Sequence, residues 1–232
     1  MNAIDDYSLF EPEEDSFFDN SHDNPFEDNH DFEFFKDQDA FFTKNEEFQN
    51  GDTEFGSMVG NPDEWAFYYH AQTNPSSCAL VAQQGILKTF GIEVSESDLI
   101  DTGIENGVFS NHNGTPMENV GDILEIYGVK TEKFYNGDIE NLIDELKDGN
   151  KVIVGLDANE VWSPQSSLDP FNYWKTELPD SGHAVWITGI DKEQGVVIMN
   201  DSGIPNGQAR VVEINDFLNS WEDYNNFYCT TR

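Results

Sequence analysis

The spacing of apolar residues predicts helices early and strands late in the region that follows residue 57. Apolar positions at helical intervals predict a helix over 76–90, which Gly91 ends, and a second helix over 138–147. Capping-box patterns at Ser95 and at Thr115 predict two further helix starts. The helix that starts at Thr115 is predicted to span 115–127, with Gly128 as its stop.

The later part of the chain carries runs of β-branched and other apolar residues that are typical of strands. The predicted strands are 152–156, 184–190, 196–199 and 211–214. Gln194 and Gly195 suit a tight hairpin between the second and third of them. Helices first and an antiparallel sheet second predict the α+β class.

The composition changes near Gly56 and predicts two parts, an acidic tail over 1–56 and an ordered domain over 57–232. Residues 1–56 hold 18 acidic and 2 basic side chains and 11 of the 18 Phe, with one Ile, one Leu and no Val. Such a segment buries too little apolar surface to offset the entropy of ordering, so disorder is expected. Its Phe pairs favour docking on a partner as much as a plain solubilising role.

The formal charge of −35 argues against nucleic acid as a partner, because phosphate contacts need Lys and Arg. It also disfavours anionic membranes, and no apolar run approaches the length of a membrane span. The N-terminus lacks the basic and apolar regions of a secretory signal. The sequence therefore predicts a soluble protein that is cytoplasmic or is exported without a cleaved signal peptide.

Cys78 is the first candidate for chemistry, because it lies at the start of the predicted helix 76–90. Free N–H groups and the helix dipole lower the pKa of a thiol at that place and make it a usable nucleophile. The alternative is a buried, inert cysteine. Gln72, six residues earlier, could donate its side-chain amide to an oxyanion beside the sulfur. Cys229 is the second cysteine, and a bridge to it would remove the free thiol.

His183 and Asp201 complete a possible thiol site. His183 opens a predicted strand next to Gly182, where it could accept the thiol proton and return it to a leaving group. Asp201 follows the next strand and could orient the imidazole. Asn200 is the alternative orienting residue, and since side chains alternate along a strand, only one of the two should face His183.

Several segments together resemble the bacteriocin-processing, double-glycine family of papain-like cysteine peptidases. The similar segments are 72–90, 146–154, 182–191 and 197–203. The resemblance spans roughly residues 65–230 and leaves the tail out. This chain departs from the family pattern at Ser77 and Ala79 beside the cysteine, and at Ser202 after the acidic residue.

The resemblance implies a papain-like fold, with N-terminal helices packed on a C-terminal antiparallel sheet. It also implies a catalytic triad of Cys78, His183 and Asp201, with Gln72 in the oxyanion hole. We expect a soluble cysteine peptidase that cleaves a peptide or protein through an acyl-enzyme, with no metal or cofactor. The rival hypotheses are an amide or acyl transferase on the same framework and a catalytically silent peptide-binding module. The acidic tail is expected to dock either on the active site or on a basic partner.

Overall fold

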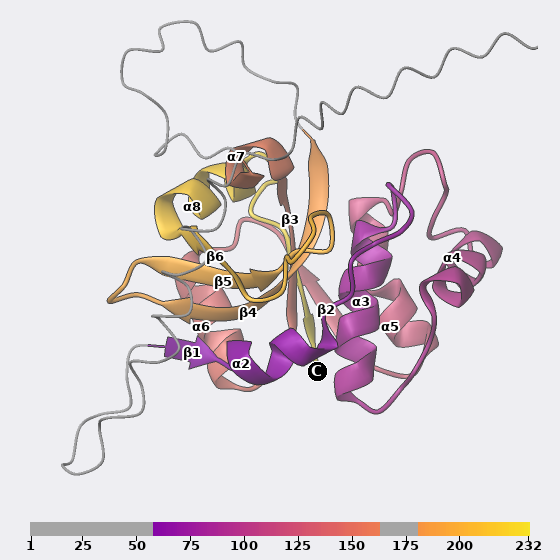
Figure 1. The fold of residues 1–232 in the computed structure, drawn as a ribbon, viewed down its shortest axis with the longest axis horizontal. Coiled ribbons are helices and arrows are strands. Elements are labelled where there is room, and N and C mark those ends of the chain that lie inside the picture. Colours follow the sequence, from indigo (N-terminus) through magenta and orange to yellow (C-terminus); the bar gives the residue numbers. More distant parts are fainter. Residues whose placement is uncertain (1–57, 163–180) are drawn as a thin grey trace, which may run out of the picture. The chain divides into compact units, whose positions relative to one another are not determined.

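The structure of this protein is a computed structural model that describes residues 58–162 and 181–232 (Figure 1). The predicted acidic tail, 1–56, lies outside the described residues. The helices are α2 (Pro62–Trp65), α3 (Cys78–Thr89), α4 (Glu96–Glu105), α5 (Asp122–Ile126), α6 (Ile139–Lys147), α7 (Ala158–Trp162) and α8 (Ile214–Glu222), with 3₁₀ turns η2 (Ala66–Tyr68) and η3 (Met117–Asn119). The strands are β1 (Met58–Gly60), β2 (Thr131–Phe134), β3 (Val152–Asp157), β4 (Gly182–Asp191), β5 (Val196–Asn200), β6 (Arg210–Glu213) and β7 (Tyr228–Thr231).

The described strands form one seven-stranded sheet in which every pairing is antiparallel. The order along the sheet is β2-β7-β3-β4-β5-β6, and β1 pairs with the end of β4. The predicted α+β class is therefore confirmed. Among the described residues, none of the helices is both long enough and apolar enough to cross a bilayer.

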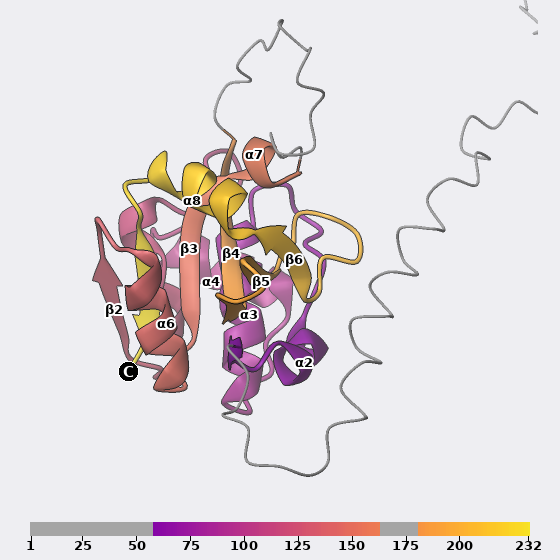
Figure 2. The same cartoon turned by 90° about the vertical axis from the view of Figure 1, so that its left-hand side faces the viewer.

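Helices cover both faces of this sheet. α3 lies against one face with α4 and α5 beyond it, whereas α6 and α8 lie on the other face (Figures 1 and 2). Because both faces are covered, the central strands are buried throughout: every residue of β3 is buried, and so is every residue of β4 after Gly182. This explains why these strands read as continuous apolar runs and not as an alternating pattern.

The close packing of α3 on β4 positions the start of α3 beside the start of β4. Gly85 faces the indole of Trp186, and a β-carbon on Gly85 would lie 3.1 Å from that ring. A larger residue at this position would push the helix away from the sheet. The predicted helix 76–90 agrees with α3, and Gly91 follows it with a positive φ of 74°.

The predicted helix over 115–127 is wrong, because the chain turns at Gly121. η3 ends at Asn119, Gly121 has a φ of 99°, and only then does α5 begin. The side-chain oxygen of Gln83, on α3, accepts hydrogen bonds from the backbone N–H groups of Gly121 (3.1 Å) and Leu124 (3.3 Å). A tertiary contact thus fixes the start of α5 at a place that the local capping pattern does not mark.

The predicted strands 152–156, 184–190 and 196–199 agree with β3, β4 and β5, but the strand predicted over 211–214 ends too late. β6 stops at Glu213, and Ile214 begins α8, where its N–H bonds to the carbonyl of Gly195. The predicted hairpin holds, since Gly195 has a φ of 69° in the β4–β5 turn. Six further helices and strands were not predicted, namely β1, β2, β7, α2, α7 and α8, and neither was the 3₁₀ turn η2.

Candidate active site

Cys78 is the first residue of α3 and is half-buried. Ser77 precedes it at the N-cap position, yet its side chain makes no capping hydrogen bond. Its hydroxyl instead lies 2.8 Å from the carbonyl oxygen of Asn74 and 2.6 Å from Oε1 of Glu96. The first N–H groups of the helix are therefore not capped by Ser77, and they face the region of the thiol.

His183 lies near the start of β4, opposite Leu156 of β3, and is almost fully buried. Its Nε2 is 2.7 Å from Oδ1 of Asp201. The imidazole also hydrogen-bonds the thiol of Cys78. Since Nε2 is engaged by Asp201, the contact with Cys78 falls to Nδ1. The structure thus brings three of the predicted site residues into one hydrogen-bonded line.

These contacts shift the pKa values of both members of the thiol–imidazole pair. Burial raises the pKa of the Cys78 thiol, but the hydrogen bond and charge of His183 and the N–H groups of Ala184 and Ala79 bring it below its ordinary value. Burial lowers the pKa of His183, but hydrogen bonds to Asp201 and Cys78 outweigh burial and raise it to about 9. Both shifts favour a thiolate facing an imidazolium.

Asp201 is fully buried and accepts hydrogen bonds on both carboxylate oxygens. Oδ1 accepts from His183 and from the N–H of Gly203 (3.0 Å). Oδ2 accepts from Nε1 of Trp162 (2.8 Å) and from Arg210 (3.2 Å). Burial raises the pKa of Asp201, but these donors and the charge of His183 hold it below its usual value. The carboxylate stays ionised and faces the imidazole.

Asn200 points away from His183. Its amide donates to the carbonyl of Trp65 (2.8 Å) and its oxygen accepts from the N–H of Ala209 (3.0 Å). The side chains of Asp201 and Asn200 thus point to opposite sides of β5 at its end, as the alternation of side chains along a strand requires. Of the two candidates, the structure brings only Asp201 to the imidazole.

Gln72 lies at the start of the loop that leads to Cys78, next to Ser202. The backbone N–H of Gln72 donates to the backbone carbonyl of Ser202 (2.9 Å), and the side-chain Oε1 of Gln72 accepts from the hydroxyl of Ser202 (3.0 Å). Its Nε2 donates to the carbonyls of Asn74 and Pro75, each at 3.0 Å. In this arrangement both amide N–H groups are engaged by the loop, so the oxyanion role of Gln72 stays a prediction.

Trp162 and Arg210 belong to this site but were not predicted from the sequence. The ring of Trp162 meets the imidazole of His183 edge to face, with centroids 5.3 Å apart. Arg210 bonds Asp201 and also the carbonyl of Val161, so it ties the end of α7 to the carboxylate. Trp162 stands 39 positions before Asp201, so no local pattern links the two residues. Arg210 stands nine positions after Asp201, across the turn between β5 and β6, and no motif marks it.

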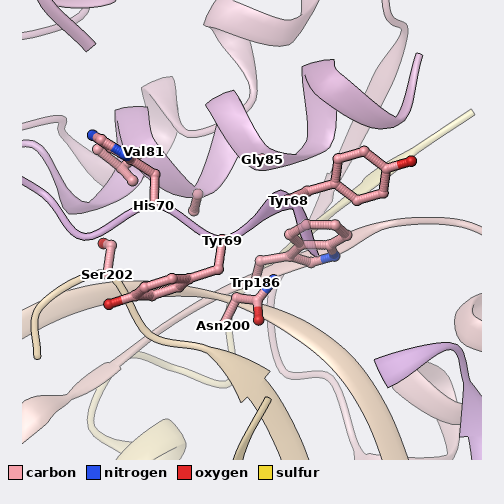
Figure 3. A pocket seen from close by; sticks show the side chains of 9 residues that line it. Tyr68, Tyr69, His70, Val81, Gly85, Trp186, Asn200 and Ser202 are labelled. Atoms are coloured by element: carbon pink, nitrogen blue, oxygen red, sulfur yellow. The ribbon is translucent and has the colours of Figure 1, made fainter. Parts of the chain in front are cut away.

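A small pocket lies between α3 and the sheet, and Ser202 is part of its lining. Val81 and Gly85 of α3 lie above it, Trp186 and Asn200 of the sheet lie below it, and Tyr69 passes between them (Figure 3). Its cavity volume is about 10 Å³, which is about the space of one water molecule. This pocket is too small for a substrate side chain, and its described lining includes neither Cys78 nor His183.

Comparison with known families identifies the family of the chain. The family model described as Peptidase_C39 like family matches residues 65–229, a region that holds every predicted site residue. The chain belongs to this family. The predicted resemblance to double-glycine peptidases is confirmed at the family level, and membership of the C39-like family supports a cysteine peptidase.

Relatives and solved structures agree with the C39-like assignment. The chain is 27% identical over 206 residues to an uncharacterized protein of Mycobacterium tuberculosis and to one of Mycobacterium bovis, covering 78% of this chain and 87% of each relative. A crystal structure described as a C39-like peptidase of Bacillus anthracis superposes with a TM-score of 0.53 at 17% identity, over 75% of this chain and 97% of that one. The peptidase domain of Streptococcus ComA, a bifunctional ABC transporter, gives 0.50 at 15% identity, over 70% and 96%. These structures show the same fold.

Proposed function

We propose that this protein is a cysteine peptidase whose catalytic residues are Cys78, His183 and Asp201. The observation that carries the proposal is the position of His183, which hydrogen-bonds Cys78 on one side and Asp201 on the other. A buried imidazole between a thiol and an ionised carboxylate is the arrangement that thiol acyl-transfer chemistry needs.

The proposed reaction proceeds in two halves. The thiolate of Cys78 attacks the carbonyl carbon of a peptide bond, and a C–S bond forms while the carbonyl oxygen takes up negative charge. The imidazolium of His183 then gives its proton to the leaving amine as the C–N bond breaks, which leaves a thioester on Cys78. Water then attacks the thioester as His183 takes up its proton. The C–S bond breaks, which releases the product carboxylic acid and restores the thiolate of Cys78 beside the imidazolium of His183.

Asp201 and the start of α3 support these steps. Asp201 holds the imidazole so that Nδ1 faces the sulfur, and its charge stabilises the imidazolium that each half-reaction needs. The N–H groups of Cys78 and Ala79 at the start of α3 lie beside the thiol, where they can donate to the oxyanion. Substrates of this class are peptides or proteins.

A comparison of the two cysteines tests the proposal. Cys78→Ala should abolish cleavage of a defined peptide mixture, read by mass spectrometry, while thermal unfolding stays close to that of the unchanged protein. Cys229→Ser is the matched control: Cys229 is buried, and burial raises the pKa of its thiol to about 11, so it should not react. Peptide cleavage within tenfold of the unchanged protein in the Cys78→Ala variant contradicts the proposal.

The products separate hydrolysis from acyl transfer. Hydrolysis releases a new carboxylate, which carries ¹⁸O when the reaction is run in labelled water. A product joined to an added amine, with no labelled carboxylate, would assign transfer to the same three residues instead of hydrolysis.

A further inference from the structure

Glu96 is a buried carboxylate that binds the loop between Gln72 and Cys78. It lies at the start of α4 and is only 6% exposed. Its two oxygens accept from the N–H of Thr73 (3.0 Å to each) and the hydroxyl of Thr73 (2.8 Å), from the N–H of Asn74 (3.1 Å) and from the hydroxyl of Ser77 (2.6 Å). One side chain therefore holds three residues of a loop that begins at one predicted site residue and ends at another.

The carboxylate is held in its charged form by the loop itself. Burial raises the pKa of Glu96, but the hydrogen bonds from Ser77, Asn74 and Thr73 bring it below its ordinary value. His70 adds a nearby ring nitrogen, 3.5 Å from Oε2. These donors offset the desolvation free energy of the buried carboxylate. Removing the carboxylate should destabilise the loop, because several buried donors would be left without an acceptor.

The contact with Ser77 has a specific consequence for the start of α3. A serine at an N-cap position ordinarily accepts a hydrogen bond from the second or third N–H of its own helix. Here the hydroxyl is turned toward Glu96 and the Asn74 carbonyl, and no capping bond forms. The N–H groups of Ala79 and its neighbours thus remain available to the thiolate, and Ala79 does donate to Cys78.

We propose that Glu96 is a positioning residue that fixes the Thr73–Ser77 loop and keeps Ser77 off its own helix, so that the N–H groups at the start of α3 can bind the oxyanion. This inference rests on the proposed peptidase function, since it assigns how the oxyanion site of that reaction is kept open. Glu96 does not touch the reacting atoms and acts through Ser77 and the loop. The pair formed by Cys78 and His183 does not depend on it, because His183 is held by Asp201.

Two reagents that differ in one respect test this role. Acylation by p-nitrophenyl acetate forms a C–S bond, releases nitrophenolate and passes through an oxyanion. Alkylation by iodoacetamide forms a C–S bond, releases iodide and involves no oxyanion. Glu96→Ala should slow acylation of Cys78 by about 100-fold, comparable to loss of an oxyanion donor. Alkylation of Cys78 should stay within about threefold of the unchanged protein, since His183 lowers the pKa of the thiol more than the N–H of Ala79 does.

Conservative variants separate positioning from general damage. Glu96→Gln can keep its oxygen at the Oε1 position, where Ser77 and Asn74 donate, so its acylation rate should recover most of the loss. Glu96→Asp keeps the charge but moves the carboxylate away from the loop by one methylene. It should lower the acylation rate of Cys78 and leave the alkylation rate unchanged. This variant keeps the test valid if the alanine variant fails to fold. Asp191→Ala is the matched control: Asp191 is a buried carboxylate that holds the β4–β5 turn through the N–H groups of Glu193 and Gln194, and its loss should change neither reaction.

The outcomes are distinct. Acylation that is unchanged in Glu96→Ala and in Glu96→Asp overturns the inference, and so does an equal loss of acylation and alkylation in Glu96→Asp, which marks a merely structural role. A full-length, unaltered protein in which Cys78 reacts with neither reagent faster than a free cysteine overturns the proposed peptidase function, and the role of Glu96 falls with it.

Discussion

The indole N–H of Trp162 donates to Oδ2 of Asp201 across 2.8 Å, while the ring of the same tryptophan lies against His183. One side chain thus holds the carboxylate and covers the imidazole that the carboxylate orients. These two contacts act on the same hydrogen bond, the one between His183 and Asp201. The ring limits the access of water to it, and the N–H fixes the carboxylate plane.

Trp162→Phe should separate these contributions. Phenylalanine keeps a ring over His183 but cannot donate to Asp201, so the acylation rate should fall by about tenfold, on the order of the loss of one hydrogen bond to a charged group. Trp162→Ala removes the ring as well and should be slower still. Rates measured with p-nitrophenyl acetate check this order, and an alanine variant as fast as the phenylalanine variant would show that the ring contributes nothing.

The orienting carboxylate should be far more important for activity than its neighbour. Asp201→Ala should lower kcat by orders of magnitude, as loss of a triad carboxylate does in other enzymes. Asn200→Ala should mainly reduce the free energy of unfolding, because its amide bridges Trp65 and Ala209. Steady-state kinetics and urea unfolding of both variants provide the measurement. The reverse order of kcat losses would assign the orienting role to Asn200.

The pH dependence of kcat/KM should be bell-shaped. Activity should rise with pH as Cys78 loses its proton, at a pH below the ordinary thiol value of 9.0, because His183 and nearby N–H groups stabilise the thiolate. It should fall as pH increases through about 9, where His183 loses the proton that the leaving amine needs. Rates from about pH 5 to about pH 10 cover both limbs.

Asp201→Asn is the matched variant for the alkaline limb. The hydrogen bond and the charge of Asp201 both raise the pKa of His183, so their weakening should move that limb to lower pH. An alkaline limb that stays in place in this variant would show that Asp201 does not set the pKa of His183.

Gly121 should be essential for stability and not for chemistry. It has a φ of 99°, and a β-carbon there would lie 2.5 Å from the sulfur of Cys229 and 3.0 Å from Oγ1 of Thr131. Gly121→Ala should therefore lower the free energy of unfolding by about 3 kcal/mol or more, from backbone strain and overpacking together. Gly128→Ala is the control, since it has a φ of 88° but nothing within 4 Å of the added carbon. It should lose only about 1 kcal/mol. Equal losses in thermal or urea unfolding would contradict the packing argument.

The sequence predicted those elements whose signal is local and strong. The stripe of α6 and its cap at Asp138 are both local, and the structure has the helix from Ile139 to Lys147 with the cap in place. The buried strands β3 and β4 were equally clear from their apolar runs. The short strand β1 has no such signal, because its three residues become a strand only by pairing with Gly189–Asp191.

The residues of the candidate site also differ in whether the sequence around them carries a signal. Cys78 and His183 stand beside recognisable element starts, and alternation along β5 correctly limited the residue that faces His183 to one of Asp201 and Asn200. Glu96 and Trp162 could not be predicted, because each reaches the site from an element that is distant in sequence. Arg210 lies only nine residues after Asp201, but its side chain matches no local pattern either. The function of the acidic tail stays a prediction from composition.

Cys78 lies on α3, whereas His183 lies on β4 and Asp201 directly follows β5, so the thiol becomes reactive only after the helix and the sheet have packed together. His183 follows Cys78 by 105 residues and Asp201 follows by a further 18, so synthesis delivers the nucleophile long before its base. Until β4 and β5 have emerged and α3 has packed on them, Cys78 is an ordinary thiol with an ordinary pKa. The onset of rapid alkylation at Cys78 during refolding should therefore mark the docking of α3 on the sheet.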